Sequence, residues 1–191
     1  MKRIGILGMQ GAIAEHRRKV EETGAESVIV RTREELAAVD GLILPGGEST
    51  AMGRLLNRFD LMNPLKQTIE QGLPVWGTCA GMILLADRIE GQSERYLRTM
   101  DITVRRNAYG SQLDSFSCRQ RISGIGGDDP LPLVFIRAPF ITELGSRVRE
   151  VAAIDGNIVC AEQDNMLVSS FHPELTDDAR FHQYFADRFV G

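Results

Sequence analysis

Short apolar runs alternate with helical patterns through the first half of the chain, and this alternation constrains the fold more than any other feature. The predicted strands cover residues 3–7, 27–30, 41–44 and 74–76. The predicted helices cover residues 12–22, 34–38, 50–58, 64–71 and 80–89. Strands and helices that alternate at this spacing predict a parallel sheet with helices on both faces.

The second half has a different pattern, with several short strands and few helical segments. Its predicted strands cover residues 102–104, 114–121, 133–136, 148–154, 157–161 and 166–169. The Asp155-Gly156-Asn157 turn predicts a hairpin between two of them. We therefore expect antiparallel strands added to the parallel core, and a closing helix over 177–189. No repeat, linker or low-complexity stretch divides residues 1–191, so a single domain is expected.

Composition excludes several classes of function. Apolar residues make up 43% of the chain and charged residues 25%, which is typical of a globular protein with a core. The formal net charge of −4 argues against general nucleic-acid binding, which needs a concentrated basic surface. No run approaches the roughly 18 apolar residues of a membrane span, and the opening MKRIGILGMQG lacks the apolar segment of a signal peptide. The three cysteines form no CxxC pair, which predicts no disulfide framework and a reducing cytoplasm.

The junction between the strand predicted to begin at Pro74 and the next helix carries the strongest chemical signal. It reads Gly77-Thr-Cys-Ala-Gly81, with glycines two residues on either side of Cys79. This pattern is typical of a nucleophile elbow, a tight strand-to-helix turn that exposes one side chain at the C-terminal edge of a sheet. The helix amides favour the thiolate form of Cys79, and the Ala80 amide is placed to meet an oxyanion.

The alternative interpretation of Cys79 is a buried cysteine that merely packs at a helix start. Cys118 and Cys160 lie in ordinary strand patterns without flanking glycines, and for them we adopt the packing interpretation.

A cysteine nucleophile needs a base, and the chain has three histidines. His16 and His182 fall within predicted helices among charged or polar neighbours, which favours surface or structurally satisfied side chains. His172 differs, because Pro173 disfavours helical dihedrals at the residue before it. In an extended segment, residues two apart face the same side, so Glu174 is expected to orient the His172 imidazole. Cys79, His172 and Glu174 together form a candidate triad.

A third element, Leu44-Pro-Gly-Gly-Glu-Ser-Thr50, follows the strand predicted over 41–44. Its glycines allow a ligand to approach the backbone closely and offer free amides for an oxyanion. The conservative interpretation is a turn followed by a helix cap. The glycine run at positions 5, 8 and 11 does not match GxGxxG, so no dinucleotide site is predicted.

With these elements placed, the chain resembles class I (triad-type) glutamine amidotransferases. More narrowly, it resembles the family of glutaminase subunits of pyridoxal 5′-phosphate synthases. The segments that carry the resemblance run from end to end: GILGMQGA, LILPGGEST, GTCAG, RRNAYGSQLDSF, FIRAP and SFHPEL. The resemblance implies an α/β, flavodoxin-like three-layer sandwich whose central sheet is mainly parallel with added antiparallel strands. Residues 124–130 depart from the family pattern by being slightly longer.

The resemblance also implies roles for individual residues. Cys79 would be the nucleophile, His172 the general base and acid, and Glu174 its orienting partner. The amides of Gly47 and Ala80 would stabilise the oxyanion. Contacts to L-glutamine would come from Gly47, Glu48, Ser49, Arg106, Ile136 and Arg137. Without the family context, Arg106 and Arg137 read as solvated charges at strand edges.

The implied reaction is hydrolysis of L-glutamine to L-glutamate and ammonia through a γ-glutamyl thioester, without a metal or organic cofactor. The implied partner is a (β/α)₈-barrel synthase subunit in a large hetero-oligomer, which makes pyridoxal 5′-phosphate from ribose 5-phosphate and glyceraldehyde 3-phosphate. The glutaminase would be weakly active until docked. Three alternatives stay open: a glutaminase for histidine, purine or anthranilate synthesis, a non-catalytic regulatory subunit of the same fold, and a protein whose elbow cysteine senses oxidation.

Overall fold

The computed structural model describes residues 1–107 and 115–191. Part of the RRNAYGSQLDSF stretch, and the first residue of the strand predicted over 114–121, lie outside the described residues. The strands of the first half are β1 (Arg3–Leu7), β2 (Glu26–Val30), β3 (Gly41–Leu44), β4 (Val75–Thr78) and β5 (Ala86–Ile89). The later strands are β6 (Met100–Arg105), β7 (Ser115–Gln120), β8 (Leu131–Ile136), β9 (Phe140–Leu144), β10 (Arg149–Ile154), β11 (Asn157–Gln163) and β12 (Met166–Ser169).

The helices flank these strands in chain order. They are α1 (Ile13–Glu22), α2 (Arg33–Leu36), α3 (Ser49–Arg58), α4 (Met62–Glu70), α5 (Ala80–Leu85) and α6 (Arg180–Arg188). A 3₁₀ turn, η1 (Pro173–Leu175), precedes α6. Within the described part of the chain, no helix is long and apolar enough to cross a bilayer.

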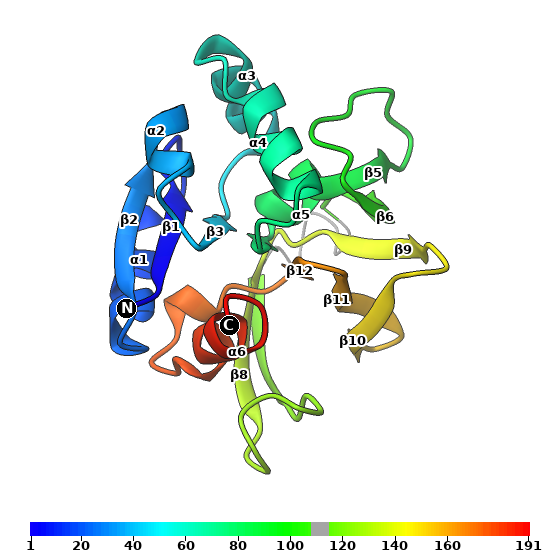
Figure 1. Cartoon of the computed structure of the whole chain (residues 1–191). Coiled ribbons are helices and arrows are strands. Elements are labelled where there is room, and N and C mark those ends of the chain that lie inside the picture. The colour runs from blue at the N-terminus through cyan, green and yellow to red at the C-terminus, as the bar shows by residue number, and fades with distance from the viewer. Residues whose placement is uncertain (108–114) are drawn as a thin grey trace.

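The main sheet has the order β2-β1-β3-β4-β12-β11-β9-β6-β5, with β10 paired to β11. In the first part of this order, from β2 through β1, β3 and β4 to β12, each strand is parallel to the next. Antiparallel pairs then connect β12, β11, β9 and β6, while β5 runs parallel to β6. β7 and β8 form a separate antiparallel hairpin, which projects at the bottom of Figure 1. The predicted parallel core with added antiparallel strands is confirmed.

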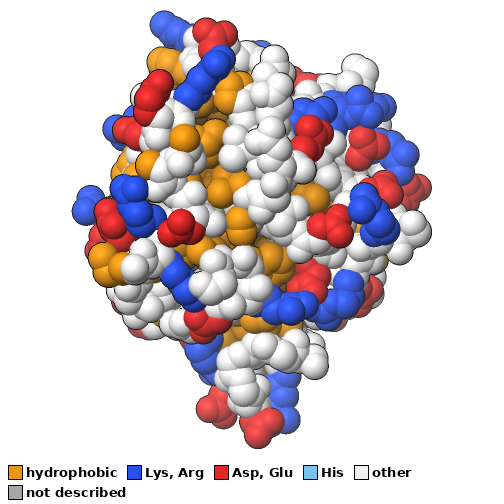
Figure 2. Space-filling model, viewed as in Figure 1, with side chains coloured by type: hydrophobic (Ala, Val, Ile, Leu, Met, Phe, Trp, Pro, Cys, Tyr) orange, Lys and Arg blue, Asp and Glu red, His pale blue; other side chains and the backbone are white. Residues whose placement is uncertain are grey.

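Helices cover both faces of the parallel core, and each face has its own apolar cluster (Figure 1). Because side chains alternate along a strand, Leu44 enters the cluster under α3, α4 and α5, while Ile43 enters the cluster under α1 and α6. Trp76 of β4 is fully buried in the second cluster. Most charged side chains lie on the surface, although Lys19, Glu162 and Glu174 are buried. On the face in Figure 2, basic and acidic groups are interspersed.

The helix predicted over 80–89 is wrong in its second half. Helix α5 ends at Leu85, and Ala86 is extended with ψ 139°. From Ala86 the chain continues as β5, whose Ile89 pairs with Val104 of β6. A short apolar run has the same sequence pattern in a buried helix and in a buried strand. The end of α5 is therefore set by the pairing of β5 with the later strand β6.

Two further differences concern the second half of the chain. Strand β9 was not predicted, although it lies between β11 and β6 in the sheet. The last helix begins at Arg180 rather than 177, because the Asp178 carboxylate accepts the Arg180 backbone N–H at 2.9 Å in the turn before α6. The predicted hairpin is confirmed: Asp155 and Gly156 have φ of 49° and 79°, and β10 pairs with β11 on either side of them.

Candidate active site

Cys79 occupies the sharp turn between β4 and α5. Its φ of 49° and ψ of −103° lie far outside the usual range for a residue with a side chain. A β-carbon on Gly81 would overlap the carbonyl oxygen of Leu44, and one on Gly77 would overlap the Gly81 backbone. The glycines therefore play the steric role predicted for them, and the strained elbow geometry is present.

Pairing between β4 and β12 brings the C-terminal segment to this turn. The Cys79 N–H donates to the Ser169 carbonyl at 2.7 Å, directly beyond the last paired residues of the two strands. Three residues later, the His172 N–H donates to the Val134 carbonyl of β8 at 2.8 Å. These contacts fix the backbone of His172, and its side chain lines the same cavity as Cys79.

Glu174 lies behind the His172 imidazole, with no exposed side-chain surface. Nδ1 of His172 donates to Oε1 of Glu174 at 2.7 Å. The predicted pairing is present, but the extended segment predicted to produce it is not. Glu174 lies in the 3₁₀ turn η1, and this turn, rather than strand alternation, directs the carboxylate toward His172.

The pKa values of the pair favour a charged imidazolium facing a carboxylate. Burial alone would lower the pKa of His172, but its interactions with Cys79 and Glu174 outweigh burial and raise the pKa to about 10. Burial also disfavours the Glu174 anion, yet the neighbouring His16 and His172 hold the pKa of Glu174 below its usual value. An imidazole held in this way stabilises a thiolate nearby.

A cavity of about 540 Å³ opens above Cys79, which suits a small-molecule substrate. All the predicted site residues except the buried Glu174 contribute to its lining. They are Gly47, Glu48, Ser49, Cys79, Ala80, Arg106, Ile136, Arg137 and His172.

The PGGEST loop after β3 forms one wall of this cavity and also caps a helix. The Glu48 carboxylate accepts the N–H groups of Thr50 and Ala51 at 2.9 and 2.7 Å, so the cap of α3 is Glu48 rather than the following serine or threonine. Burial opposes ionisation of Glu48, but these hydrogen bonds and Arg106 keep its pKa below the usual value. The Ala12 N–H donates to the Gly46 carbonyl at 3.2 Å, so the N–H of Gly47 points away from Ala12 in the planar trans peptide.

The two predicted arginines differ in environment. Arg106 is held at the cavity wall: Nη2 donates to the Tyr96 hydroxyl at 2.8 Å and Nη1 to Oγ1 of Thr50 at 3.3 Å. Its Nε is buried and has no hydrogen-bond partner among the residues described. Arg137 is exposed and has a φ of 42°, just beyond the end of β8. Arg106 is therefore not the solvated strand-edge charge of the conservative interpretation.

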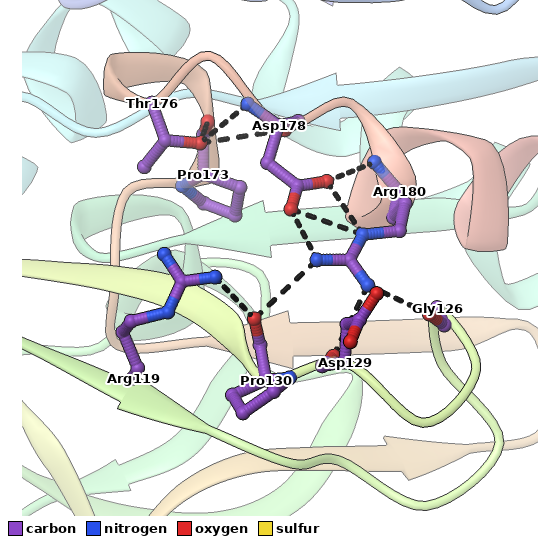
Figure 3. A network of polar contacts seen from close by, with 8 residues as sticks. All are labelled: Arg119, Gly126, Asp129, Pro130, Pro173, Thr176, Asp178 and Arg180. Atoms are coloured by element: carbon purple, nitrogen blue, oxygen red, sulfur yellow. Dashed lines mark hydrogen bonds and ion pairs between the residues drawn. The ribbon is translucent and has the colours of Figure 1, made fainter.

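The segment over 124–130, which the resemblance suggests is slightly longer than in the family, is fastened to the start of α6 by Arg180 (Figure 3). Its guanidinium donates to the carbonyls of Gly126, Asp129 and Pro130 at 2.7, 3.1 and 3.4 Å. The same group pairs with Asp178 at 2.6 Å. This segment leads directly into β8, which carries Ile136 toward the cavity, so the contacts of Arg180 support this part of the cavity wall.

Sequence reasoning missed two residues near the site. Gln10, within the GMQG stretch after β1, lines the cavity, and its Oε1 accepts the Glu48 N–H at 2.9 Å. His16 is fully buried, with Nε2 at 3.5 Å from Oε2 of Glu174. The signals available for Gln10 were its position after the first strand and its place in the GILGMQGA segment, whereas His16 resembled any other polar residue of a helix.

Comparison with known proteins decides the family. The model of the SNO glutamine amidotransferase family matches residues 6–191. The chain belongs to this family. Two similar relatives, each called pyridoxal 5′-phosphate synthase subunit PdxT, come from Clostridium botulinum and Clostridium kluyveri. The Clostridium botulinum protein is 52% identical to this chain, and the match covers 100% of this chain and 98% of the relative's length. The Clostridium kluyveri protein is 55% identical, and the match covers 96% of this chain and 97% of the relative's length.

Solved structures confirm the predicted fold class for this family member. A crystal structure of a glutamine amidotransferase matches with a TM-score of 0.92 and 38% identity, over 98% of each chain. The structure of PurLQS from Thermotoga maritima matches with a TM-score of 0.69 at 14% identity, over 98% of each chain, and is a likeness of fold alone.

Proposed function

We propose that this chain hydrolyses L-glutamine to L-glutamate and ammonia as the glutaminase subunit of a pyridoxal 5′-phosphate synthase, with Cys79, His172 and Glu174 as its triad. Membership of the glutamine amidotransferase family supports the reaction, and the PdxT relatives support the pathway. The observation that carries the triad is the strained Cys79 elbow, which shares a cavity with His172 while Nδ1 of His172 is bound to Glu174 at 2.7 Å.

In the proposed mechanism, the Cys79 thiolate attacks the side-chain amide carbon of glutamine. The amides of Gly47 and Ala80 stabilise the tetrahedral oxyanion. His172 then protonates the departing ammonia, which leaves a γ-glutamyl thioester on Cys79. A water molecule gives a proton to His172 and attacks the thioester, and as glutamate leaves, the Cys79 thiolate and the His172 imidazolium are restored. Glu174 stabilises the imidazolium in both halves of the cycle.

Charge at the cavity wall supports glutamine as the substrate. Arg106 and Arg137 provide guanidinium groups for the α-carboxylate, which arginine binds well in a bidentate manner. Gly47, Glu48, Ser49 and Ile136 complete the proposed glutamine contacts, and Glu48 adds an anion beside the α-ammonium.

Ammonia released into bulk water would be protonated and lose its nucleophilicity, which favours direct delivery to a second active site. We place that site on a (β/α)₈-barrel synthase subunit within a large hetero-oligomer. This subunit would make pyridoxal 5′-phosphate from ribose 5-phosphate and glyceraldehyde 3-phosphate, and its docking would activate the glutaminase. We also propose that residues 1–191 act as one domain. A cytoplasmic location fits a catalysis that needs a free thiol, and all three cysteines are unpaired.

The rival functions differ in partner and in triad. A glutaminase for histidine, purine or anthranilate synthesis would require another synthase, and the PdxT relatives weigh against it. A non-catalytic subunit or an oxidation sensor would need neither the His172–Glu174 pair nor the arginines beside the cavity.

The test is glutamate release by the purified chain mixed with its synthase subunit. We expect Cys79→Ala to lower release by several orders of magnitude, because the thioester cannot form. The matched control is Cys118→Ala, since Cys118 lies on β7 and burial raises the pKa of its thiol. Undiminished release by Cys79→Ala would contradict the triad. Activation by a synthase other than a pentose-phosphate-using barrel would contradict the pathway.

A further inference from the structure

A row of buried polar side chains leads from the triad into the protein between α1 and α6. His16 and His182 are 0% and 1% exposed, and Nδ1 of His16 lies 2.9 Å from Nε2 of His182. On the other side of its ring, Nε2 of His16 lies 3.2 Å from Oγ1 of Thr78 and 3.5 Å from Oε2 of Glu174. A single imidazole thus faces both the triad carboxylate and the residue that precedes Cys79.

The position of His16 matters because its ring faces the second carboxylate oxygen of Glu174. Oε1 is bound to His172, whereas Oε2 is buried and lacks a partner at ordinary hydrogen-bond distance within the described residues. A buried carboxylate oxygen without a donor disfavours the charged form strongly. The His16 Nε2 is the ring nitrogen that faces it.

Only one arrangement of protons satisfies this row. If Nε2–H of His182 donates to Nδ1 of His16, then His16 carries its proton on Nε2 and presents it to Glu174 and Thr78. Nδ1 of His182, which is buried and without a partner among the described atoms, is then a bare acceptor. The reverse direction would bury an unpaired His182 N–H and aim a His16 lone pair at a carboxylate, and both are costly.

Packing holds the two rings in this orientation. Trp76 meets His16 and His182 edge-on, with ring centroids 5.6 and 4.8 Å away. Its indole N–H donates to Oγ of Ser169 at 3.1 Å, which ties the indole to β12. The charged and titratable groups that act on this pair are Glu174, His172, Glu15 and Lys19.

We propose that His16 is a positioning residue of the reaction, whose neutral imidazole donates Nε2–H to the second oxygen of Glu174 and keeps that carboxylate ionised and directed at His172. His182 fixes the tautomer of His16. Without the donor, Glu174 takes up a proton and no longer stabilises the His172 imidazolium, so the Cys79 thiolate forms only at higher pH. The inference rests on the proposed glutaminase function.

The test compares two amides at position 16. His16→Gln places an amide N–H near the position of Nε2, whereas His16→Asn keeps a polar group toward His182 but is too short to reach Glu174. We expect kcat of the asparagine variant to fall about 10- to 100-fold, as for loss of a hydrogen bond to a charged group. Its KM should stay within about twofold, because His16 does not line the cavity. The glutamine variant should recover most of the activity.

A second readout needs no glutamine and separates this inference from the function on which it rests. Iodoacetamide alkylation of Cys79, followed on its peptide by mass spectrometry, should move to higher pH in His16→Asn and return in His16→Gln. If the wild-type chain with its synthase subunit releases no glutamate, the glutaminase proposal fails. An altered alkylation profile would in that case still support the role of His16.

Two controls distinguish positioning from general destabilisation. Val20→Ala removes a buried side chain of the same helix, and should lower the melting temperature without changing the alkylation profile. In a Glu174→Gln background, His16→Asn should lower kcat by no more than about twofold further, because the two residues act as one unit. If the asparagine variant does not fold, His16→Met carries the same expectation. A folded asparagine variant with wild-type kcat and alkylation, or additive losses in the double variant, would overturn the proposal.

Discussion

Burial disfavours the charged forms of His16 and His182 in the folded protein, and this contributes to its response to acid. Burial is the main cause: it lowers the pKa of His16 and lowers the pKa of His182 further, although Glu174 and Glu15 oppose the shift at His16. On unfolding, both rings enter water and regain an ordinary pKa near 6.5. Below that pH the unfolded chain binds protons that the folded chain does not, so stability falls as the pH falls.

We expect the free energy of unfolding to decrease from pH 7 to pH 5, with each histidine contributing up to about 1.4 kcal/mol per pH unit below 6.5. Urea unfolding of the wild type and of His182→Gln at several pH values measures this slope. Glutamine cannot take up the proton, so the variant should show the shallower dependence. Equal slopes would mean that His182 is already charged in the folded state.

At the same scale, the sequence predicts the triad but not the histidines behind it. Glycines mark Cys79 and a proline marks His172, and such signals act locally. His16 gains its role only when α6 packs on α1, through a contact between residues 166 positions apart. No local pattern records such a contact.

At the scale of elements, the close packing of the elbow against β3 allows a sharp test. Gly81→Ala forces a β-carbon against the Leu44 backbone, which cannot yield as a flexible side chain would. We expect a destabilisation of about 1–3 kcal/mol, typical of overpacking, together with a large loss of kcat because the elbow shifts Cys79. Thermal unfolding and glutamate release measure the two effects.

Gly24→Ala is the matched control for this variant. Gly24 has a φ of 81° and open space around it, so alanine there strains the backbone by about 1 kcal/mol but lies away from the cavity. Its kcat should equal that of the wild type. If both variants lose activity in proportion to stability, the elbow packing has no specific effect on the reaction.

Element boundaries were predictable where local signals coincide with pairing, and not elsewhere. Strands β1, β3 and β12 match the predicted ranges, since each is a short apolar run between turn signals. β9 is flanked by Pro139 and Gly145, so a local signal was present although the strand was not predicted. β5 continues directly from α5 without a turn signal between them, and it owes its conformation to pairing with β6. Tertiary contacts override local preference at such positions.

At the scale of the whole molecule, Arg180 fastens the β7–β8 hairpin to the C-terminal helix. We expect Arg180→Met to lower the free energy of unfolding by about 1–3 kcal/mol, because three backbone carbonyls and Asp178 lose a charged donor. Amide hydrogen exchange over residues 124–130 should accelerate about tenfold or more. Hydrogen-exchange mass spectrometry measures the exchange rate of this segment, and the exchange rate of α5 serves as the internal reference.

Arg119→Met serves as the comparison, since among the described residues Arg119 donates only to the Pro130 carbonyl, at 2.9 Å, from an exposed position. Its effect on exchange should be much smaller. Equal acceleration in the two variants would show that the hairpin is not held chiefly by Arg180.

The position of β12 beside β4 has a consequence for the protein during its synthesis. The backbone contact from Cys79 to Ser169 joins residues 90 positions apart in the sequence, so synthesis must pass residue 169 before this contact becomes possible. Until then the cysteine has neither its base nor its final strand neighbour. A nascent chain that ends before Ser169 therefore lacks both this strand contact and the proposed base, and we expect it to leave glutamine intact.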